Sequence, residues 1–154
     1  MMIFDRRSFL ISAGAAAAFP APLLASSVAG FQMWHSPGCN CCLKWKERID
    51  AQFGRQLKVI ETPDMLKVKR ANGVPQGLWG CHTALIGKVV VEGHVPPADI
   101  RRFIDKRPKG FSGLAVPLMP LGAPGMDVGH SAKEPYKVYA FAPDGRRTVF
   151  ASYE

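Results

Sequence analysis

Three of the four cysteines of this 154-residue chain lie within four positions, in the stretch Ser36-Pro37-Gly38-Cys39-Asn40-Cys41-Cys42. The fourth cysteine, Cys81, directly precedes His82. The Pro-Gly turn joins a strand-like run to a helix-like run, so we expect the sulfur atoms to lie at a helix N-terminus. The N–H groups and the dipole at that end of a helix favour thiolate over thiol. Because thiolates bind soft metal ions and attack disulfides, the stretch predicts metal or redox chemistry.

The spacing of the cysteines leaves three interpretations open. Cys39 and Cys42 have the Cys-x-x-Cys spacing of dithiol redox centres, although Cys41 beside them invites disulfide scrambling. Purely structural bridges would pair Cys39–Cys42 with Cys41–Cys81, or Cys39–Cys41 with Cys42–Cys81. Neither arrangement closes a long loop at each bridge, where bridges stabilise most. A metal site explains the crowding best, and Cu(I) prefers sulfur, whereas Cys-x-Cys-Cys is unusual for structural zinc.

Further candidate ligands come later in the chain. His94 follows a predicted strand whose end should return toward the cysteine loop, and the alternative is a surface turn histidine. His82 is either a ligand or a residue at a strand end. Met119 and Met126 lie in a segment rich in Pro and Gly, where they would be core residues or thioether ligands to Cu(I).

Hydrophobic periodicity predicts the elements that position these residues. Apolar residues recur at helical spacing in 43–53, and Gly87-Lys88 is a typical two-residue hairpin turn. A third helix, starting at Pro96, should bury Ile100, Phe103 and Ile104. The full set of predicted elements is strand 31–35, helix 43–53, strand 57–61, a short helix between 63 and 73, strands 83–86 and 89–92, and the helix from 96.

The order β-α-β-α-β-β-α is that of an α/β, thioredoxin-like domain. In such a domain the loop after the first strand carries the reactive cysteines, and the residues just before the third strand lie beside it. Cys81 and His82 occupy that place, so we expect the fold to bring the fourth cysteine to the first three.

The segment 108–154 is expected to form a C-terminal extension of a single domain spanning 30–154. Residues 113–126 are rich in Pro and Gly and should be irregular. Residues 136–142 and 146–153 predict a terminal β-hairpin around Pro143-Asp144-Gly145.

Residues 1–29 have the three-part layout of an export signal. Arg6 and Arg7 precede an apolar run, and small residues around Ala29 offer a cleavage site. The Arg6-Arg7 pair resembles a twin-arginine signal, and an ordinary secretory signal or an uncleaved anchor is the alternative. Because the run is weakly apolar and prolines interrupt it, we do not expect it to form a permanent transmembrane helix. No later segment could span a bilayer, so we expect no stable membrane span after removal of the signal.

The formal net charge is +8, from 20 Lys and Arg against 12 Asp and Glu. The basic residues are spread over several predicted helices without interleaved aromatic residues, and an exported protein has little access to nucleic acid. We therefore expect a solvated basic surface and no nucleic-acid partner.

Several stretches together resemble the CopG-type periplasmic copper-resistance family, many members of which are catalogued only as a domain of unknown function. The matching stretches run over nearly all of the mature chain: they are 36–42, 73–75, 81–84, 92–96, 113–120 and 123–126. The family usually has Gly where this chain has Asn40.

The resemblance implies a thioredoxin-like fold and copper held by the Cys-x-Cys-Cys cysteines Cys39, Cys41 and Cys42, together with Cys81. It extends to Met119, Met126 and His94 as further ligands. It also implies a periplasmic location, copper-handling partner proteins and Cu(I)/Cu(II) redox cycling in copper resistance.

The function expected from the sequence is therefore an exported protein that binds Cu(I). Two alternatives are a thiol–disulfide oxidoreductase using Cys39 and Cys42, and a copper chaperone without redox turnover. Whether the protein is an enzyme, such as a copper oxidoreductase, is left open.

Overall fold

The computed structural model describes residues 30–106, 108–127, 129 and 132–154. The predicted export signal, 1–29, lies outside the described residues. Along the described chain the elements are β1 Gly30–His35, α1 Asn40–Phe53, β2 Lys58–Glu61, α2 Met65–Ala71, the 3₁₀ helix η1 Gln76–Leu78, β3 His82–Gly87, β4 Val89–Glu92, α3 Pro97–Asp105, β5 Gly113–Ala115, β6 Tyr136–Phe141 and β7 Arg147–Tyr153.

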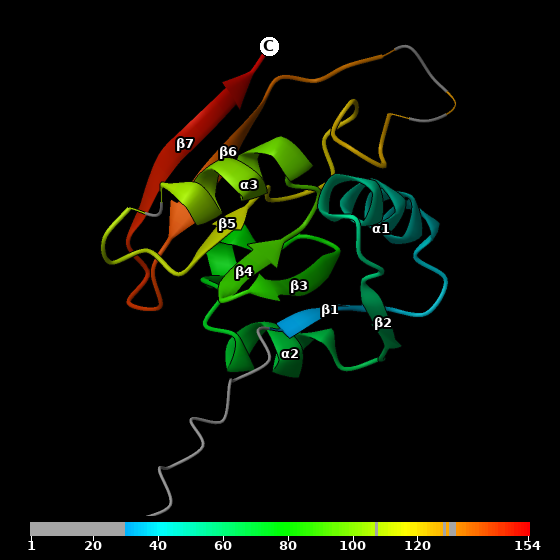
Figure 1. Cartoon of the computed structure of the whole chain (residues 1–154), viewed down its shortest axis with the longest axis horizontal. Helices are drawn as coiled ribbons and strands as arrows, with labels where there is room; N and C mark the ends of the chain where they lie inside the picture. Colours follow the sequence, from blue (N-terminus) through cyan, green and yellow to red (C-terminus); the bar gives the residue numbers. More distant parts are fainter. Residues whose placement is uncertain (1–29, 107, 128, 130–131) are drawn as a thin grey trace, which may run out of the picture.

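The strands form one seven-stranded mixed sheet in the order β2-β1-β3-β4-β5-β6-β7 (Figure 1). β1 and β2 are parallel, as are β4 and β5, while the other neighbouring pairs are antiparallel. The predicted order of strands and helices up to α3 is confirmed, and so is the terminal hairpin of β6 and β7. The protein is therefore a mixed α/β protein.

Successive residues of β4 point to opposite faces of the sheet, as the strand period of two requires. Val89 and Val91 belong to the larger core cluster, which contains side chains of α1 and α3. Val90 belongs to a second cluster, which contains residues of the segment that follows α2. Helices α1 and α3 therefore cover one face of the sheet, and the α2–η1 segment covers the other.

Local sequence explains how the helices begin. The carboxylate of Asp64 accepts a hydrogen bond from the backbone N–H of Lys67, so it caps the N-terminus of α2. Pro97 is the first residue of α3, where its missing N–H is not needed. In α1, Trp45 and Ile49 lie one turn apart and are both fully buried, which explains the helical periodicity of this segment.

Two expectations were wrong. The segment 113–126 was expected to be irregular, but Gly113–Ala115 forms β5, which joins the terminal hairpin to β4. Ile104 was expected on the buried face of α3, but it is 40% exposed, while Ile100 and Phe103 are buried. Ile104 directly follows Phe103 at the end of a nine-residue helix, so it points beside the core instead of into it.

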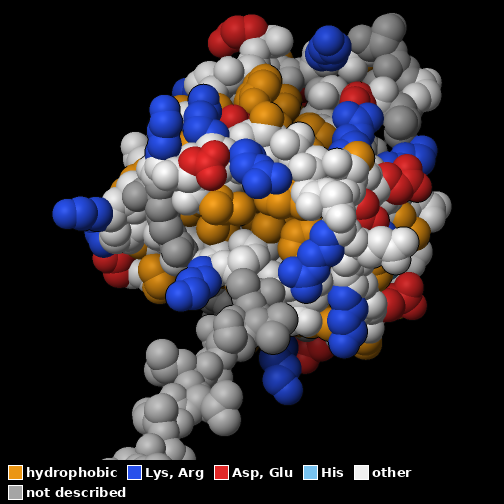
Figure 2. All heavy atoms as spheres, viewed as in Figure 1, with side chains coloured by type: hydrophobic (Ala, Val, Ile, Leu, Met, Phe, Trp, Pro, Cys, Tyr) orange, Lys and Arg blue, Asp and Glu red, His pale blue; other side chains and the backbone are white. Residues whose placement is uncertain are grey.

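The surface is mixed in character. On the face shown in Figure 2, Lys and Arg side chains are spread among acidic and apolar groups instead of gathering in one patch. Across the described residues, the helices are all too short or too polar to span a bilayer.

Candidate metal centre

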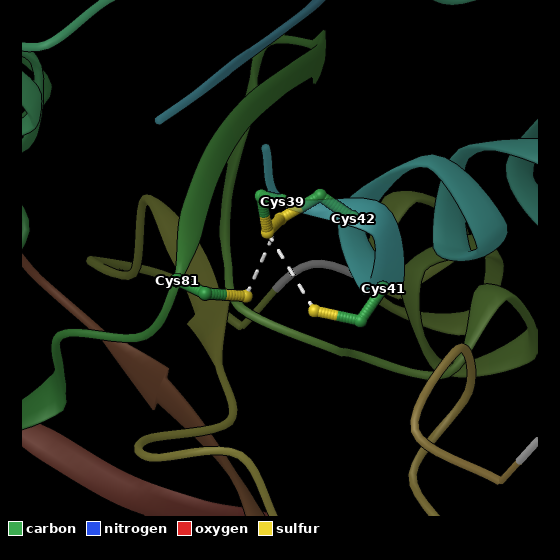
Figure 3. Close-up of side chains that lie close together, drawn as sticks. All are labelled: Cys39, Cys41, Cys42 and Cys81. Atoms are coloured by element: carbon green, nitrogen blue, oxygen red, sulfur yellow. Dashed lines mark hydrogen bonds between the residues drawn. A yellow bond between two sulfur atoms is a disulfide. The ribbon is translucent and has the colours of Figure 1, made fainter. Parts of the chain in front are cut away.

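The four cysteines meet at the N-terminus of α1, as the sequence predicted. Cys39 is the N-cap residue of α1, and Cys41 and Cys42 lie in its first turn. Cys81 precedes β3, which pairs with β1, so the sheet brings it to the same place. The four sulfur atoms all lie within 4.8 Å of one another (Figure 3).

Two of the four thiols are joined in this structure. Cys39 and Cys42 form a disulfide, whereas Cys41 and Cys81 are free. The Sγ atom of Cys39 lies 3.6 Å from that of Cys41, and the Sγ atom of Cys42 lies 3.6 Å from that of Cys81. Each free thiol therefore touches one sulfur of the disulfide, so reduction of one bond would leave four adjacent thiols.

A close crossing of two glycine residues brings Cys81 and His94 together. Gly80 precedes Cys81 and Gly93 precedes His94, and a Cβ on Gly80 would lie only 2.8 Å from the Cα of Gly93. Gly93 has a left-handed backbone (φ +68°), and a Cβ there would lie 2.4 Å from the carbonyl oxygen of Val116. Side chains at either glycine would separate the two segments, before β3 and after β4, that carry Cys81 and His94.

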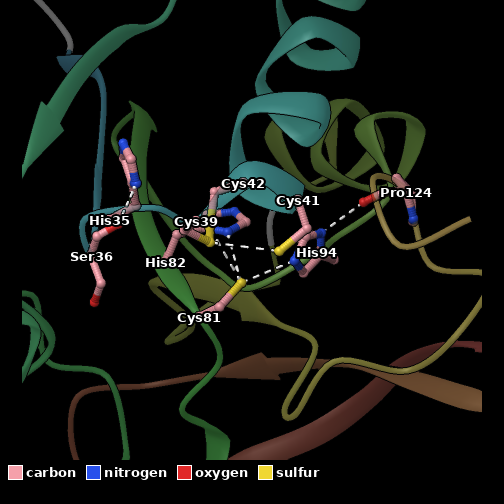
Figure 4. The surroundings of a disulfide bond; sticks show 9 residues. All are labelled: His35, Ser36, Cys39, Cys41, Cys42, Cys81, His82, His94 and Pro124. Atoms are coloured by element: carbon pink, nitrogen blue, oxygen red, sulfur yellow. Dashed lines mark hydrogen bonds between the residues drawn. A yellow bond between two sulfur atoms is a disulfide. The ribbon is translucent and has the colours of Figure 1, made fainter. Parts of the chain in front are cut away.

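The imidazole of His94 is aimed at the cysteine cluster. Its Nε2 lies 2.9 Å from Sγ of Cys81, and its Nδ1 lies 2.8 Å from the carbonyl oxygen of Pro124 (Figure 4). Because that carbonyl oxygen only accepts, Nδ1 carries the proton and donates it, which leaves the Nε2 lone pair facing the sulfur. Burial lowers the pKa of His94 below its ordinary value, so the ring is neutral at pH 7. A neutral imidazole held through its other nitrogen is the usual arrangement of a metal-ligating histidine.

His82 is a second buried imidazole beside Cys81. Its side chain is fully buried, its ring packs on Trp45 with 4.3 Å between centroids, and its Nδ1 lies 3.3 Å from Sγ of Cys81. Among the described residues its Nε2 has no hydrogen-bond partner. Burial lowers the pKa of His82 well below its ordinary value. The sequence left the role of His82 open, and the structure groups it with Cys81 and His94, whose ligand atoms lie within 4.8 Å of one another.

His35 was expected to be structural. It is buried, and its Nδ1 lies 2.8 Å from the carbonyl oxygen of Ser36. Figure 4 shows its ring pointing away from the sulfur atoms.

The segment after β5 covers the cluster at the start of α1. Gly125 is buried there: a Cβ on it would lie 2.7 Å from the carbonyl oxygen of Cys41 and 3.2 Å from Nδ1 of His94. Asp127 fastens the segment to α1 through an ion pair with Arg48, at 2.6 Å. Met126 lies between these two attachments and is partly buried.

Met119 lies elsewhere in the same segment. It is 51% exposed and lines a groove of about 660 Å³ with Pro117, Tyr136 and Tyr153, and none of the cysteines and histidines that the structure describes lines that groove. The role of Met119 and Met126 as ligands therefore stays a prediction.

Burial, together with the adjacent Cys41, raises the pKa of Cys81 to about 12. Cys81 is therefore a neutral thiol at pH 7, although the helix N-terminus next to it favours thiolates. A metal ion at this sulfur must displace its proton. In the reduced protein the four sulfurs would form one group of donor atoms, and Cys81 with the two neutral imidazoles forms a second group that shares this cysteine. Thiolates and imidazoles are ligands suited to a soft metal ion.

Comparisons with known proteins identify the family of the chain. The family described as "Protein of unknown function, DUF411" matches residues 78–126, which include Cys81, His82 and His94. No curated protein matches the chain at a significant level.

Two solved structures of a protein named copper resistance protein CopG are similar to the chain. Form 1 has 35% sequence identity and a TM-score of 0.72, over 79% of this chain and 94% of that protein. Form 2 has the same identity and TM-score, over 80% and 96%. With this identity over nearly the whole relative, the chain belongs to the CopG family of copper resistance proteins.

Proposed function

We propose that this protein is an exported, periplasmic copper-binding protein that holds Cu(I) through Cys39, Cys41, Cys42 and Cys81. The observation that carries the proposal is the meeting of four sulfur atoms within 4.8 Å at the start of α1. Cu(I) is a soft ion that favours thiolate ligands. The kinship with a copper resistance protein supports a role in copper resistance.

His94 completes the proposed site, since its Nε2 faces Cys81 and needs to lose no proton at pH 7. Met126 is a further proposed ligand, because the chain around it packs on α1 beside Cys41. Met119, which is half exposed at a groove, also stays a proposed copper ligand. The partners proposed are other periplasmic copper-handling proteins.

We place this site in a thioredoxin-like domain of residues 30–154, exported by the signal 1–29. The neighbouring strands β2-β1-β3-β4, with α1 and α3 on one face and α2 on the other, support that assignment. Residues 108–154 form its C-terminal extension, which supplies the segment over the cysteines.

Copper redox cycling is the finer part of the proposal. Oxidation of the Cys39/Cys42 dithiol forms the S–S bond and releases two electrons and two protons, enough to reduce two Cu(II) to two Cu(I). The disulfide between these residues supports the assignment of the pair as the electron donor. An external dithiol would restore the reduced pair by thiol–disulfide exchange.

The test is anaerobic loading of the reduced protein, residues 30–154, with Cu(I), followed by metal analysis and a count of free thiols. We expect at least one copper per chain and thiols protected from alkylation. The Cys41→Ser/Cys42→Ser variant should lose most of this copper, whereas His35→Asn, a buried histidine that points away, should keep it. Full loading of the double cysteine variant would refute the proposal.

A thiol–disulfide oxidoreductase is the second candidate, and the Cys39–Cys42 disulfide at a helix N-terminus favours it. It predicts that metal-free protein reduces a disulfide substrate and that Cys39→Ser abolishes this activity. Absence of such activity, with copper bound and passed to an acceptor without a change of oxidation state, would instead indicate a chaperone.

A further inference from the structure

A buried carboxylate lies behind the cysteine cluster, and the copper site proposed above does not use it. Glu92, at the end of β4, is fully buried. Its Oε1 pairs with Nζ of Lys69 at 2.5 Å, and its Oε2 accepts a hydrogen bond from the hydroxyl of Thr83 at 2.7 Å. Oε1 also accepts a hydrogen bond from the backbone N–H of Gly80 at 2.6 Å.

This network lies on the opposite face of the sheet from α1. Thr83 is the register partner of Glu92, and both residues alternate with neighbours that belong to the core under α1, Ala84 and Val91. Lys69 reaches them from α2 and is itself buried, with 6% of its side chain exposed. The network therefore contacts the backbone just before Cys81, at Gly80, from the face of the sheet opposite α1.

The bond to Gly80 is what connects this network to the cluster. The Gly80 N–H is one residue from Cys81, in an irregular segment between η1 and β3 that has no ladder partner of its own. At this point Gly80 crosses Gly93, with no space for a side chain. A carboxylate that holds this N–H therefore fixes the place where the Cys81 side chain leaves the backbone.

Stability of the fold gives no sufficient reason for an ion pair here. Removal of two charges from water costs several kcal/mol per ion, and apolar residues of the same size often serve a fold equally well. If packing alone held the segment around Gly80, apolar residues in place of Lys69 and Glu92 would leave its conformation unchanged. The acceptor for Gly80, in contrast, would be lost.

We propose that Glu92 is a positioning residue for Cys81: its carboxylate, neutralised by Lys69, holds the Gly80 N–H and so sets the Cys81 sulfur against the other three. This inference rests on the proposed function, in which Cys81 holds copper. Groups that orient metal ligands in this way commonly contribute ten- to hundredfold to metal affinity.

The test compares two replacements of the buried pair in the reduced protein, residues 30–154. Lys69→Met/Glu92→Leu removes the charges and the acceptor, whereas Lys69→Met/Glu92→Gln removes the charges and keeps an oxygen for Gly80. We expect the Cu(I) affinity, measured by competition with a chromophoric Cu(I) chelator, to fall about tenfold in the first variant. The second variant should stay within about twofold of the wild type. Equal affinities in all three proteins would overturn the inference.

A double-mutant cycle separates positioning from general destabilisation. When Cys81 is already Ser, the Lys69→Met/Glu92→Leu change should have no further effect on copper affinity. An additive loss would mean that the pair acts through the fold as a whole and would overturn the proposal. Asp99→Asn is the matched control: Asp99 is also buried and ion-paired, with Arg102, so this variant should lower Tm and leave copper affinity unchanged.

Glu92→Asp provides a second test in case the double variants do not fold. It keeps the charge pair and withdraws the oxygens by one methylene, so copper affinity should again fall severalfold. If Cys81→Ser alone leaves copper affinity unchanged, the proposed copper site is wrong and the positioning role fails with it. If Cys81→Ser lowers the copper affinity, but Lys69→Met/Glu92→Leu and Glu92→Asp leave it unchanged, the copper site stands and only the positioning role is wrong.

Discussion

The Sγ atom of Cys81 lies 2.9 Å from Nε2 of His94, although the two residues are 13 positions apart and flank the β3–β4 hairpin, Cys81 just before β3 and His94 just after β4. The other nitrogen of His94 is held by the carbonyl oxygen of Pro124, a further 30 positions along. Three separate segments of the chain therefore set one sulfur and one imidazole in contact. This ordering before any ion is bound reduces the conformational entropy that metal binding would lose.

Replacement of His94 should weaken copper binding more than replacement of a histidine that is equally buried but is not a ligand. His94→Gln keeps a polar side chain of similar length but removes the lone pair that faces Cys81. We expect Cu(I) affinity to fall at least about tenfold in chelator competition. His35→Asn is the control, because His35 is equally buried and faces away. Equal losses in the two variants would show that His94 is not a ligand.

Gly125 should be needed for the site, although it carries no ligand atom. In Gly125→Ala the Cβ would lie 2.7 Å from the carbonyl oxygen of Cys41 and 3.2 Å from Nδ1 of His94, so the covering segment must move away. We expect loss of the His94–Pro124 hydrogen bond and about tenfold weaker Cu(I) binding. Gly129→Ala has a similar left-handed backbone, φ +85° against +89°, with nothing within 4 Å of its Cβ. It should therefore bind copper normally, and a matching loss there would implicate backbone strain alone.

The close approach of Gly93 to the carbonyl oxygen of Val116 should affect the free energy of unfolding. Gly87→Ala and Gly93→Ala add a Cβ at nearly the same backbone angle, φ +64° and +68°, but only the second meets an atom, the Val116 oxygen at 2.4 Å. We expect the first substitution to lower the free energy of unfolding by about 1–2 kcal/mol through left-handed strain. The second should lower it by about 1–3 kcal/mol more through overpacking. Urea unfolding of the reduced protein measures both, and equal values would contradict the close approach of Gly93 to the Val116 oxygen.

The metal-free, reduced protein should lose stability in mild acid. Burial lowers the pKa values of His82 and His94, whereas both return to their ordinary value, near 6.5, in the unfolded chain. Below pH 6.5 the unfolded state therefore binds more protons than the native state, and the free energy of unfolding falls as pH falls. Each histidine contributes a slope of up to about 1.4 kcal/mol per pH unit.

Urea unfolding at pH 7.5, 6.5 and 5.5 tests this dependence. His94→Gln should flatten the curve by removing one of the two titrating groups. A constant free energy of unfolding across this range would mean that the pKa values of the two histidines are not lowered in the native protein.

Much of the cysteine cluster and of the first half of the fold was predictable, because its signals are local. The Pro-Gly turn before Cys39 and the spacing of Trp45 and Ile49 identify α1 within a few residues. Gly87 similarly identifies the hairpin of β3 and β4. Local hydrogen bonding and one-sided burial produce these patterns, so they are visible without knowledge of distant partners.

Other features depend on segments that are far apart in the chain. The three residues of β5 carry no strand signal and are held only because β4 and β6 offer partners on both sides. In the sequence Glu92 looks like an exposed polar residue at the end of a strand. It is buried because Lys69 from α2 pairs with it. The role of His82 was open because only packing against Trp45 buries it beside Cys81.

The amino-acid sequence by itself determined which groups are available: four thiols, the imidazoles of His82 and His94, and the turn that starts a helix at the first three thiols. The tertiary structure alone decided which of them meet. It placed Cys81 against His94, closed the segment around Gly125 over both, and set Glu92 behind Cys81. Residue types and spacing specify local conformation, whereas the contact of distant atoms depends on how the strands pair and the helices pack, which no short stretch encodes.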